Sequence, residues 1–251
     1  YAEINDFEAQ LIAAGAIVPL GPLDETLVEP MARYLHALVK PSSIEALSIS
    51  YEFIKTPKDL CRWWDQVIRP AMYEVGNLWA EGRISVGQEH VASAITQRVM
   101  SVHAPMILGV PKSKPPLLVA ATRGELHDIG ARMLADVLEV DGWDVVHCGA
   151  NTPHESVLNL VRQIQPGVVC LSTTILSNLS GITGLIRRIR EEGPRDVKVV
   201  VGGRAFMNSP DVWRRVGADG HSVSATDAIA LLNSWTQPVE TVASVSDAAR
   251  P

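Results

Sequence analysis

The sequence has 251 residues, of which 47% are hydrophobic and 20% are charged, which is typical of a soluble globular protein with a sizeable core. Its net charge of −6 argues against direct nucleic-acid binding, because phosphate recognition needs a basic surface. No apolar run reaches the roughly 18 residues of a membrane span, and no signal peptide is visible. The three cysteines lack CxxC spacing, so we expect free thiols and a cytoplasmic protein.

The first half of the chain is predicted to be helical, after an N-terminal extension over residues 1–22. Apolar residues recur at helical spacing in four segments within residues 23–105, namely 26–39, 43–54, 59–82 and 85–103. Pro70 lies inside the third segment and predicts a kink or break there. The short connections between segments predict an antiparallel four-helix bundle, followed by a linker over residues 106–114.

The second half, residues 115–235, alternates short apolar runs with helical patterns. The predicted strands are residues 116–122, 144–149, 167–174, 197–203 and 219–223. Apolar strands that alternate with helices indicate a parallel sheet covered on both faces, and five of them favour a flavodoxin-like (Rossmann-like) α/β domain. Residues 236–251 are polar without periodicity, which predicts a mobile tail.

In such a sheet, ligands bind beyond the carboxyl ends of the strands, where the strand order reverses. The loop after the first predicted strand reads TRGELHDIG, which brings Glu125, His127 and Asp128 together. A lone histidine near a helix start is often only a surface or capping residue. Glu125, however, can accept the proton of one ring nitrogen of His127 and leave the other nitrogen free as a metal ligand, while Gly130 leaves room for something bulky.

The loops after the third and fourth strands complete this edge with hydroxyls, among them Ser172 and Thr174, and with the pair Gly202–Gly203. Paired glycines let a ligand approach the backbone closely. No Cys, His or carboxylate cluster with zinc spacing surrounds His127. A metal with a single protein ligand would have to bring its other ligands with it, as a metal in a macrocycle does.

These residues resemble the cobalamin-binding family, whose fingerprint is an Asp-x-His-x-x-Gly turn, a Ser-x-Leu strand end and a Gly-Gly turn. The sequence has Glu-Leu-His-Asp-Ile-Gly at 125–130, Ser-Thr-Thr at 172–174 and Gly-Gly at 202–203, and the resemblance spans nearly all of residues 115–235. It implies that His127 is the lower cobalt ligand. It also implies the cofactor-binding residues Glu125, Asp128, Ile129, Gly130, Ser172, Thr174, Gly202, Gly203 and Gly220. The sequence departs from the fingerprint at Glu125, in place of Asp, and at Thr174, in place of Leu.

The helical half offers a lid for the upper face of the cofactor. Ser85 and Gln88 match a capping box at the start of the fourth helix, so an antiparallel pair would bring Trp79 and Glu89 to the same level. The alternative is that Trp79 is a core residue and that Glu89 and His90 belong to an exposed helix face. The spacing Trp-x9-Glu-His resembles cobalamin photoreceptors of the CarH and LitR type, which implies that Trp79, Glu89 and His90 hold an adenosyl group.

Two features of those photoreceptors are missing. Too few residues precede the bundle for a helix-turn-helix domain, so we expect no direct DNA binding by this chain. A histidine that follows the tryptophan in the photoreceptors can take the upper cobalt position after light, but Ala80 stands here, which leaves His90 or His103. The chain also resembles photocobilins, which add a bilin. No cysteine lies in an obvious attachment context, so any bilin would be held noncovalently.

Three functions remain open at this point. The leading hypothesis is a light-responsive adenosylcobalamin sensor, not itself an enzyme, that acts through a homo-oligomer or a regulatory partner, without nucleic acid or membrane. The alternative is a corrinoid protein that carries methyl groups for a methyltransferase system. The third is a receiver-like or structural α/β module without a cofactor, although the acidic cluster of a phosphoacceptor site is lacking.

Overall fold

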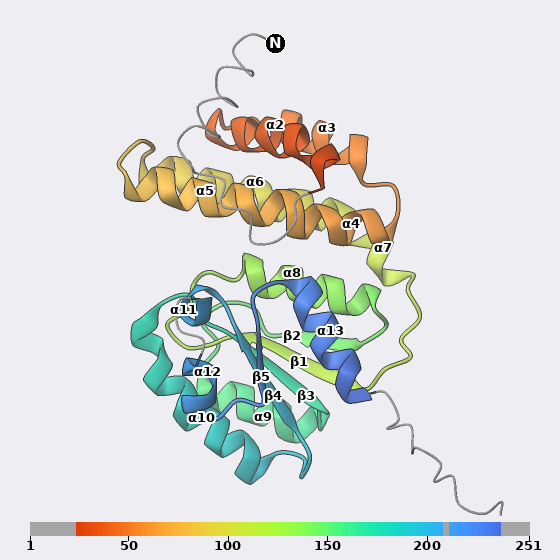
Figure 1. Cartoon of the computed structure of the whole chain (residues 1–251), viewed down its shortest axis with the longest axis vertical. Coiled ribbons are helices and arrows are strands. Elements are labelled where there is room, and N and C mark those ends of the chain that lie inside the picture. The colour runs from red at the N-terminus through yellow and green to blue at the C-terminus, as the bar shows by residue number, and fades with distance from the viewer. Residues whose placement is uncertain (1–23, 208–210, 237–251) are drawn as a thin grey trace, which may run out of the picture.

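The computed structural model describes residues 24–207 and 211–236 and consists of a helical unit stacked on an α/β unit (Figure 1). The predicted extension over residues 1–22 lies outside the described residues, as does almost all of the predicted tail over residues 236–251. Within the described ranges, no helix combines the length and apolar character needed to cross a membrane.

The helical unit consists of four helical segments, and the bounds of three of them agree closely with the predicted ones. Its elements are η1 (Glu25–Leu27), α2 (Val28–Val39), α3 (Ser43–Phe53), α4 (Pro57–Trp63), η2 (Trp64–Ile68), α5 (Arg69–Ala80), α6 (Val86–His103) and α7 (Pro105–Leu108). The third segment is interrupted where Pro70 predicted a kink or break, since α4 and α5 are separated by the π-helical turn η2 directly before Pro70. Proline has no N–H to donate to the preceding turn, and a π-turn is one way to accommodate that loss. The predicted linker over residues 106–114 is partly wrong, since it begins inside α7, where Pro105 occupies the first turn, a position that tolerates proline.

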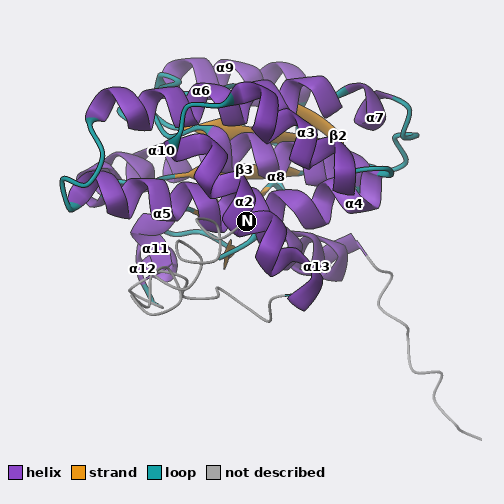
Figure 2. Ribbon diagram, turned by 90° about the horizontal axis from the view of Figure 1, so that it is seen from above, coloured by secondary structure: helices purple, strands orange, loops and turns teal. Residues whose placement is uncertain are grey.

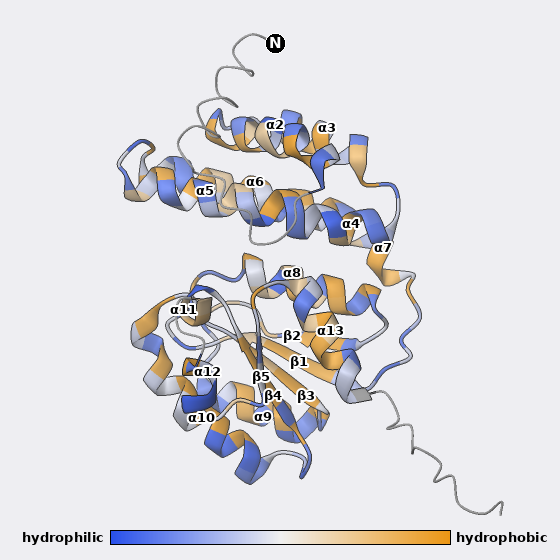
Figure 3. Ribbon diagram, viewed as in Figure 1, coloured by the Kyte–Doolittle hydropathy of each residue, from blue (hydrophilic) through white to orange (hydrophobic). Residues whose placement is uncertain are grey.

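The α/β unit contains the predicted five-stranded parallel sheet. Its strands are β1 (Pro116–Ala121), β2 (Asp144–His147), β3 (Val168–Ser172), β4 (Lys198–Gly202) and β5 (Gly220–Ser222), in the order β2-β1-β3-β4-β5. The order reverses between β1 and β3, which is the flavodoxin-like arrangement that was predicted. The central strands are buried on both faces and hydrophobic along their length (Figure 3). Burial on both faces explains why they read as continuous apolar runs in the sequence.

Helices cover both faces of the sheet (Figure 2). The long helices are α8 (Ile129–Val140), α9 (His154–Ile164), α10 (Leu179–Glu192) and α13 (Ala225–Thr236). Apolar residues of α8 and α13 pack on one face, and those of α9 and α10 pack on the other. The short elements η3 (Leu176–Asn178), α11 (Arg204–Met207) and α12 (Val212–Arg215) follow the strand ends, and of these only α12 was predicted.

The bundle packs on α8, which also covers the sheet. Met133 and Val137 of α8 belong to the same buried apolar cluster as the bundle core. At the edges of this interface, Trp64 donates its indole N–H to Asp136 of α8 over 2.9 Å, and Arg132 of α8 donates to Ser101 of α6 over 3.1 Å. The interface therefore fixes α5 and α6 in place relative to the loops that follow the strands.

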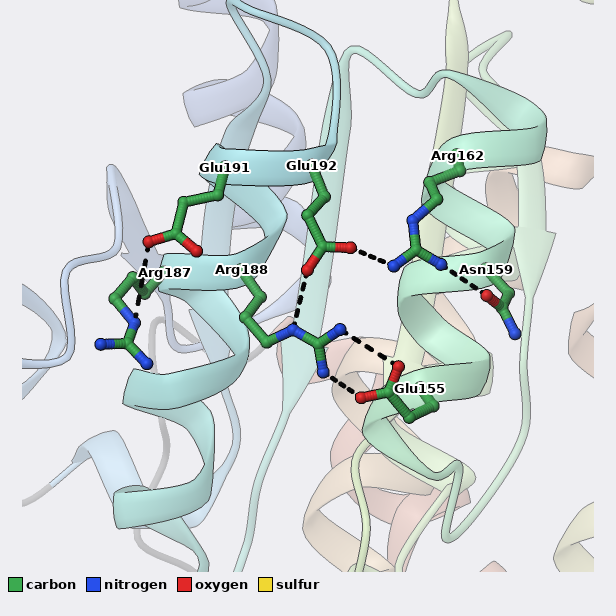
Figure 4. Close-up of polar contacts among 7 residues, drawn as sticks. All are labelled: Glu155, Asn159, Arg162, Arg187, Arg188, Glu191 and Glu192. Atoms are coloured by element: carbon green, nitrogen blue, oxygen red, sulfur yellow. Dashed lines mark hydrogen bonds and ion pairs between the residues drawn. The ribbon is translucent and has the colours of Figure 1, made fainter.

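An ion-pair network joins α9 to α10 on the opposite face of the sheet (Figure 4). Arg188 contacts Glu155 through both terminal guanidinium nitrogens and donates from Nε to Glu192 over 2.8 Å. Glu192 also accepts from Arg162, which in turn donates to Asn159 over 2.6 Å. These ion pairs lie at the surface, where each contributes little to stability by itself, and together they link α9 to α10 at several points.

Candidate functional site at the sheet edge

Three loops meet where the strand order reverses. The register pairs Ala121 of β1 with Ser172 of β3, and Ser172 with Gly202 of β4, so the three strands end at the same level. The loops that carry Glu125, His127 and the paired glycines therefore begin side by side. The structure thus brings together the loops that the sequence placed at one edge.

Glu125 is fully buried and connects two of these loops. One carboxylate oxygen accepts the backbone N–H of His127 over 2.9 Å and its ring Nδ1 over 2.6 Å. The other accepts the backbone N–H groups of Thr174 and Ile175, the latter over 3.3 Å. Burial alone would raise the pKa of Glu125, but the hydrogen bonds from Thr174 and His127 outweigh it and hold the pKa below its usual value. Glu125 is therefore an anion that fixes both the loop and the imidazole.

The imidazole of His127 is held at one nitrogen and open at the other. Because the Glu125 carboxylate can only accept, Nδ1 of His127 is the donor, and a neutral ring in this tautomer would present its lone pair on Nε2. The side chain is 61% exposed, so Nε2 is accessible. Asp128 precedes α8 without capping it through its side chain, and Ile129 begins the helix. A Cβ on Gly130 would meet nothing within 4 Å, so the space beside the first turn of α8 is open, as was expected.

The hydroxyl-bearing loop after β3 contributes mainly backbone groups, together with one unpaired hydroxyl. Ser172 ends β3, and Thr174 binds Glu125 through its backbone N–H, so the Thr174 side chain plays no part in that contact. Thr173 is buried, and its hydroxyl has no partner among the described residues; the same is true of the Thr122 hydroxyl after β1. Buried hydroxyls without partners are unusual, but both oxygen atoms are closed off from solvent in this structure, so neither is presented to a ligand.

Of the glycines at this edge, Gly203 is the one that the backbone requires, and Gly202 and Gly220 lie in close contacts. Gly203 has a φ of +96°, and a Cβ there would lie 2.4 Å from the carbonyl oxygen of Thr173. A Cβ on Gly202 would lie 3.2 Å from the carbonyl oxygen of Ser222, and one on Gly220 would lie 2.8 Å from an apolar side chain of α13. The paired glycines were expected to admit a ligand; in the structure they let the β4 turn close against the loop after β3.

The bundle places its candidate residues at the hairpin between α5 and α6. The predicted capping box of Ser85 and Gln88 is confirmed, with both reciprocal hydrogen bonds present. Trp79 is 51% exposed at the end of α5, so it is not a core residue, whereas the exposure of His90 agrees with the other part of that alternative, an exposed helix face. His90 is 74% exposed, and its Nδ1 lies 2.6 Å from the Glu89 carboxylate.

Exposed apolar side chains gather at this same end of the molecule. The loops at the sheet edge expose Leu126 and Leu176, and the α5–α6 hairpin exposes Trp79 and Val86. The hairpin and the strand ends lie at the same end of the two stacked units (Figure 1). Apolar surface that remains exposed near convergent polar groups is typical of a ligand site.

A contact between the bundle and the β4 turn was missed by the sequence reasoning. Tyr73 of α5 donates its hydroxyl to the sulfur of Met207 over 3.5 Å, and the Arg204 guanidinium lies 5.8 Å from the Tyr73 ring centroid. Arg204 and Met207 belong to α11, which directly follows Gly202–Gly203. Their contacts with Tyr73 hold α5 near the sheet edge. Tyr73 and Arg204 are far apart in the sequence, and nothing in the residues around either of them indicates that they meet in the fold.

The chemistry of this edge fits a metal that arrives with its own ligands. The described residues contain no group of three or more His, Cys, Asp or Glu side chains placed to hold a metal ion. They offer one exposed imidazole nitrogen, backed by a buried carboxylate, beside apolar surface. Such a set can supply one axial ligand to a metal macrocycle and apolar contacts to the rest of it.

Comparison with known proteins agrees with this chemistry. A B12 binding domain model matches residues 115–232, and a second B12 binding domain model matches residues 31–103. The dimethylamine corrinoid protein of Methanosarcina barkeri is 29% identical over 163 residues, which cover 63% of this chain and 75% of that protein. Dimethylamine corrinoid protein 1 of Methanosarcina acetivorans is 26% identical over 206 residues, which cover 80% and 95%.

A solved structure shares the fold. The monomethylamine corrinoid protein of Methanosarcina barkeri superposes with a TM-score of 0.70 at 21% identity, covering 83% of this chain and 99% of that chain. None of these three similar proteins is named as a photoreceptor, so the particular resemblance to the CarH and LitR type stays a prediction. The two matched domains and the corrinoid-protein relatives together support the assignment of this chain to a cobalamin-binding family.

Proposed function

We propose that this protein binds cobalamin at the sheet edge, with Nε2 of His127 as the lower ligand of cobalt. The observation that carries the proposal is the hydrogen bond between Glu125 and Nδ1 of His127, which leaves Nε2 exposed as a lone-pair donor. When bound, cobalamin supplies a cobalt centre that can hold a methyl or adenosyl group through carbon. The sheet-edge loops of this chain would orient the cofactor, through His127 and through the exposed apolar side chains beside it.

We propose methyl carriage as the role of that cofactor. The support is the similarity to corrinoid proteins named for dimethylamine, which favours this alternative over the light-sensing hypothesis. In this role the chain is a carrier, and a methyltransferase partner performs the catalysis. The bundle would exclude water from the upper face of the cofactor and would give way when the partner docks.

A light-responsive adenosylcobalamin sensor is the second candidate, and one observation favours it. The indole of Trp79 is exposed near the end of α5, instead of being packed in the bundle core, and Glu89 and His90 lie near the start of the next helix, α6. A broad indole can cover an adenosyl group, and a carboxylate can accept hydrogen bonds from ribose hydroxyls. Loss of the adenosyl group in light would then alter an oligomer or partner interface of the bundle. The cytoplasmic location and a noncovalently held bilin stay predictions.

Both proposals are tested on one sample. The protein is loaded in darkness with cobalamin, freed of unbound cofactor, and its visible spectrum is recorded before and after illumination, with methylcobalamin and adenosylcobalamin compared. Binding of either form supports the cobalamin site, and failure to bind any cobalamin contradicts it. Methyl transfer to a thiol in the presence of a methyltransferase supports carriage. A preference for adenosylcobalamin, with an irreversible change in light, supports the sensor instead.

A further inference from the structure

The bundle exposes apolar side chains on the flank where α3 packs on α6. Ile44 of α3 is 82% exposed, and Tyr51 is exposed on the same helix. Val91 and Val102 are exposed on α6. Residues seven or eleven positions apart share one face of a helix, so each pair forms a stripe along its helix. The stripes adjoin at the end of α6, where the Tyr51 ring lies 4.9 Å from the ring of His103, and together they form one surface, the α3–α6 flank.

The α/β unit does not cover this flank. α3 belongs to the layer of the bundle that faces away from the α/β unit, and α6 lies between that layer and α8 (Figure 1). Four large apolar side chains therefore stay exposed although the two units are packed together. Exposed apolar residues gathered on two adjacent helices, unlike single ones scattered over a surface, indicate a site that binds another protein.

Charged residues border the flank with opposite signs. Arg98 is exposed on α6 between the two valines, and helical periodicity places Glu45 on the border of α3 that lies away from α6. Glu52, on that same border, is already paired with Arg33 over 3.0 Å. Within the part of the chain that the structure describes, Arg98 and Glu45 take part in no ion pair. The α6 border of the flank is therefore basic and the α3 border is acidic.

The register of the two helices places these opposite charges at about the same height. Ser50 and His103 lie near the ends of α3 and α6, and the Ser50 hydroxyl lies 3.0 Å from Nε2 of His103, so the two helices run in the same direction. Glu45 and Arg98 each precede this contact by the same number of residues. A two-fold axis parallel to the helices would set α6 of one copy against α3 of another at unchanged height. Arg98 of each copy would then lie near Glu45 of the other.

We propose that the α3–α6 flank is the contact surface of a symmetric homodimer, in which the apolar stripes of two copies pack together and Arg98 of each copy pairs with Glu45 of the other. The flank is self-complementary in shape of charge, as a two-fold contact requires, because each copy supplies one basic and one acidic border. The contact uses neither the hairpin between α5 and α6 nor the loops at the strand ends. The dimer therefore forms without the cofactor, and the inference does not depend on the proposed function.

The test measures the mass of the full-length apoprotein by sedimentation equilibrium over a range of concentrations. The wild-type protein should have twice the monomer mass. Arg98→Glu and Glu45→Arg should each raise the dimer dissociation constant by about tenfold or more, because like charges would then meet across the contact. Arg187→Glu, the same charge reversal at an exposed position on α10, is the matched control and should leave the dimer intact.

Mixing the two charge-reversal variants tests the proposed pairing directly. In a dimer of one Arg98→Glu copy and one Glu45→Arg copy, opposite charges meet at both borders. An equimolar mixture should therefore recover the dimer that each variant alone loses, and this recovery would also show that both variants are folded. A wild-type protein that stays monomeric would overturn the inference, including one whose flank binds a different protein. Dimers that neither reversal weakens, or that mixing fails to recover, would overturn it as well.

Discussion

The carboxylate of Glu125 lies 2.6 Å from Nδ1 of His127 and, through its other oxygen, binds the backbone of the loop after β3. A single buried anion thereby sets the tautomer of the imidazole and joins the two loops at the reversal of strand order. Glu has a longer side chain than the Asp of the family fingerprint, and here its carboxylate accepts the backbone N–H groups of Thr174 and Ile175.

Replacement of Glu125 by Gln should weaken cobalamin binding. The amide keeps the shape but removes the charge that favours the Nδ1-protonated tautomer, and loss of such a supporting partner typically costs about 10- to 100-fold in metal affinity. Titration of the apoprotein with aquocobalamin, followed by absorbance, measures the change. Glu155→Gln, in the exposed network between α9 and α10, is the control and should leave the affinity unaltered. Equal affinities for Glu125→Gln and wild type would show that the carboxylate does not support the ligand.

Asp136 should make the protein less stable as the pH rises through the weakly acidic range. Burial raises the pKa of Asp136 to about 6, although the hydrogen bond from Trp64 opposes the rise. The folded-state pKa lies above the ordinary value of 3.8, so the stability contributed by this group is present below that value and is lost as the pH rises through about 6. Asp136→Asn keeps an acceptor for the indole and should therefore stabilise the protein at pH 7 by about 1–3 kcal/mol.

The measurement for Asp136 is denaturant unfolding at several pH values. The difference in free energy of unfolding between Asp136→Asn and wild type should grow between about pH 4 and pH 6 and then level off. Asp144→Asn changes an exposed aspartate at the start of β2 and should show no such growth. A constant difference for Asp136→Asn across this range would contradict the raised pKa.

Two glycines at the sheet edge should respond to alanine in opposite ways. Gly203→Ala places a Cβ 2.4 Å from the Thr173 carbonyl oxygen at a φ of +96°, and it should destabilise the protein by roughly 1–3 kcal/mol or more. Gly130→Ala meets nothing within 4 Å and lies in the first turn of α8, so it should be neutral or stabilising by about 0.5–1 kcal/mol. Thermal unfolding of the apoproteins measures both effects.

Gly130→Ala carries a second expectation for the loaded protein. If cobalamin passes beside this turn, the added methyl group should crowd it and weaken binding by about tenfold or more, since overpacking commonly costs about 1–3 kcal/mol. The combination of unchanged or higher stability with weaker binding would identify the open space beside Gly130 as part of the cofactor site. Unchanged cobalamin affinity would place the cofactor elsewhere along the edge.

Trp79→Ala separates the two proposed roles. Because the indole is 51% exposed, its removal should change the free energy of unfolding by no more than about 1 kcal/mol. If the bundle holds an adenosyl group, the variant should lose adenosylcobalamin faster in darkness than wild type, while methylcobalamin is retained equally. Val86→Ala, another exposed apolar residue of the hairpin, is the control. Equal retention of both forms by Trp79→Ala would argue against the adenosyl role.

The sheet could be predicted because parallel strands buried on both faces leave continuous apolar runs in the sequence. The same rule placed His127, Ser172 and Gly202 at one edge, since the ends of parallel strands meet there. The helical segment that contains Pro70 was less predictable, because proline signals an interruption without specifying a π-turn. The boundary near Pro105 was missed for a related reason, since proline both ends helices and begins them.

The candidate site, too, could be predicted from the sequence only in part. The pairing of Glu125 with His127 follows from their nearness in sequence, whereas the contact of Glu125 with Thr174 runs through a backbone N–H and depends on no side-chain type. The role of Gly203 was also hidden, because its neighbour is a carbonyl group brought near only by the fold. Contacts between the bundle and the sheet edge, such as that of Tyr73 with Met207, required the packed structure.

The most direct test of the account is electron paramagnetic resonance of the protein that contains 15N-labelled histidine and is loaded with cob(II)alamin. If His127 is the lower ligand, the axial 15N nucleus should split the cobalt lines into doublets. His127→Ala should lose this splitting, and Asp128→Asn should retain it. Triplet splitting from the unlabelled 14N of the cofactor's own base in the wild-type protein would contradict the assignment of His127.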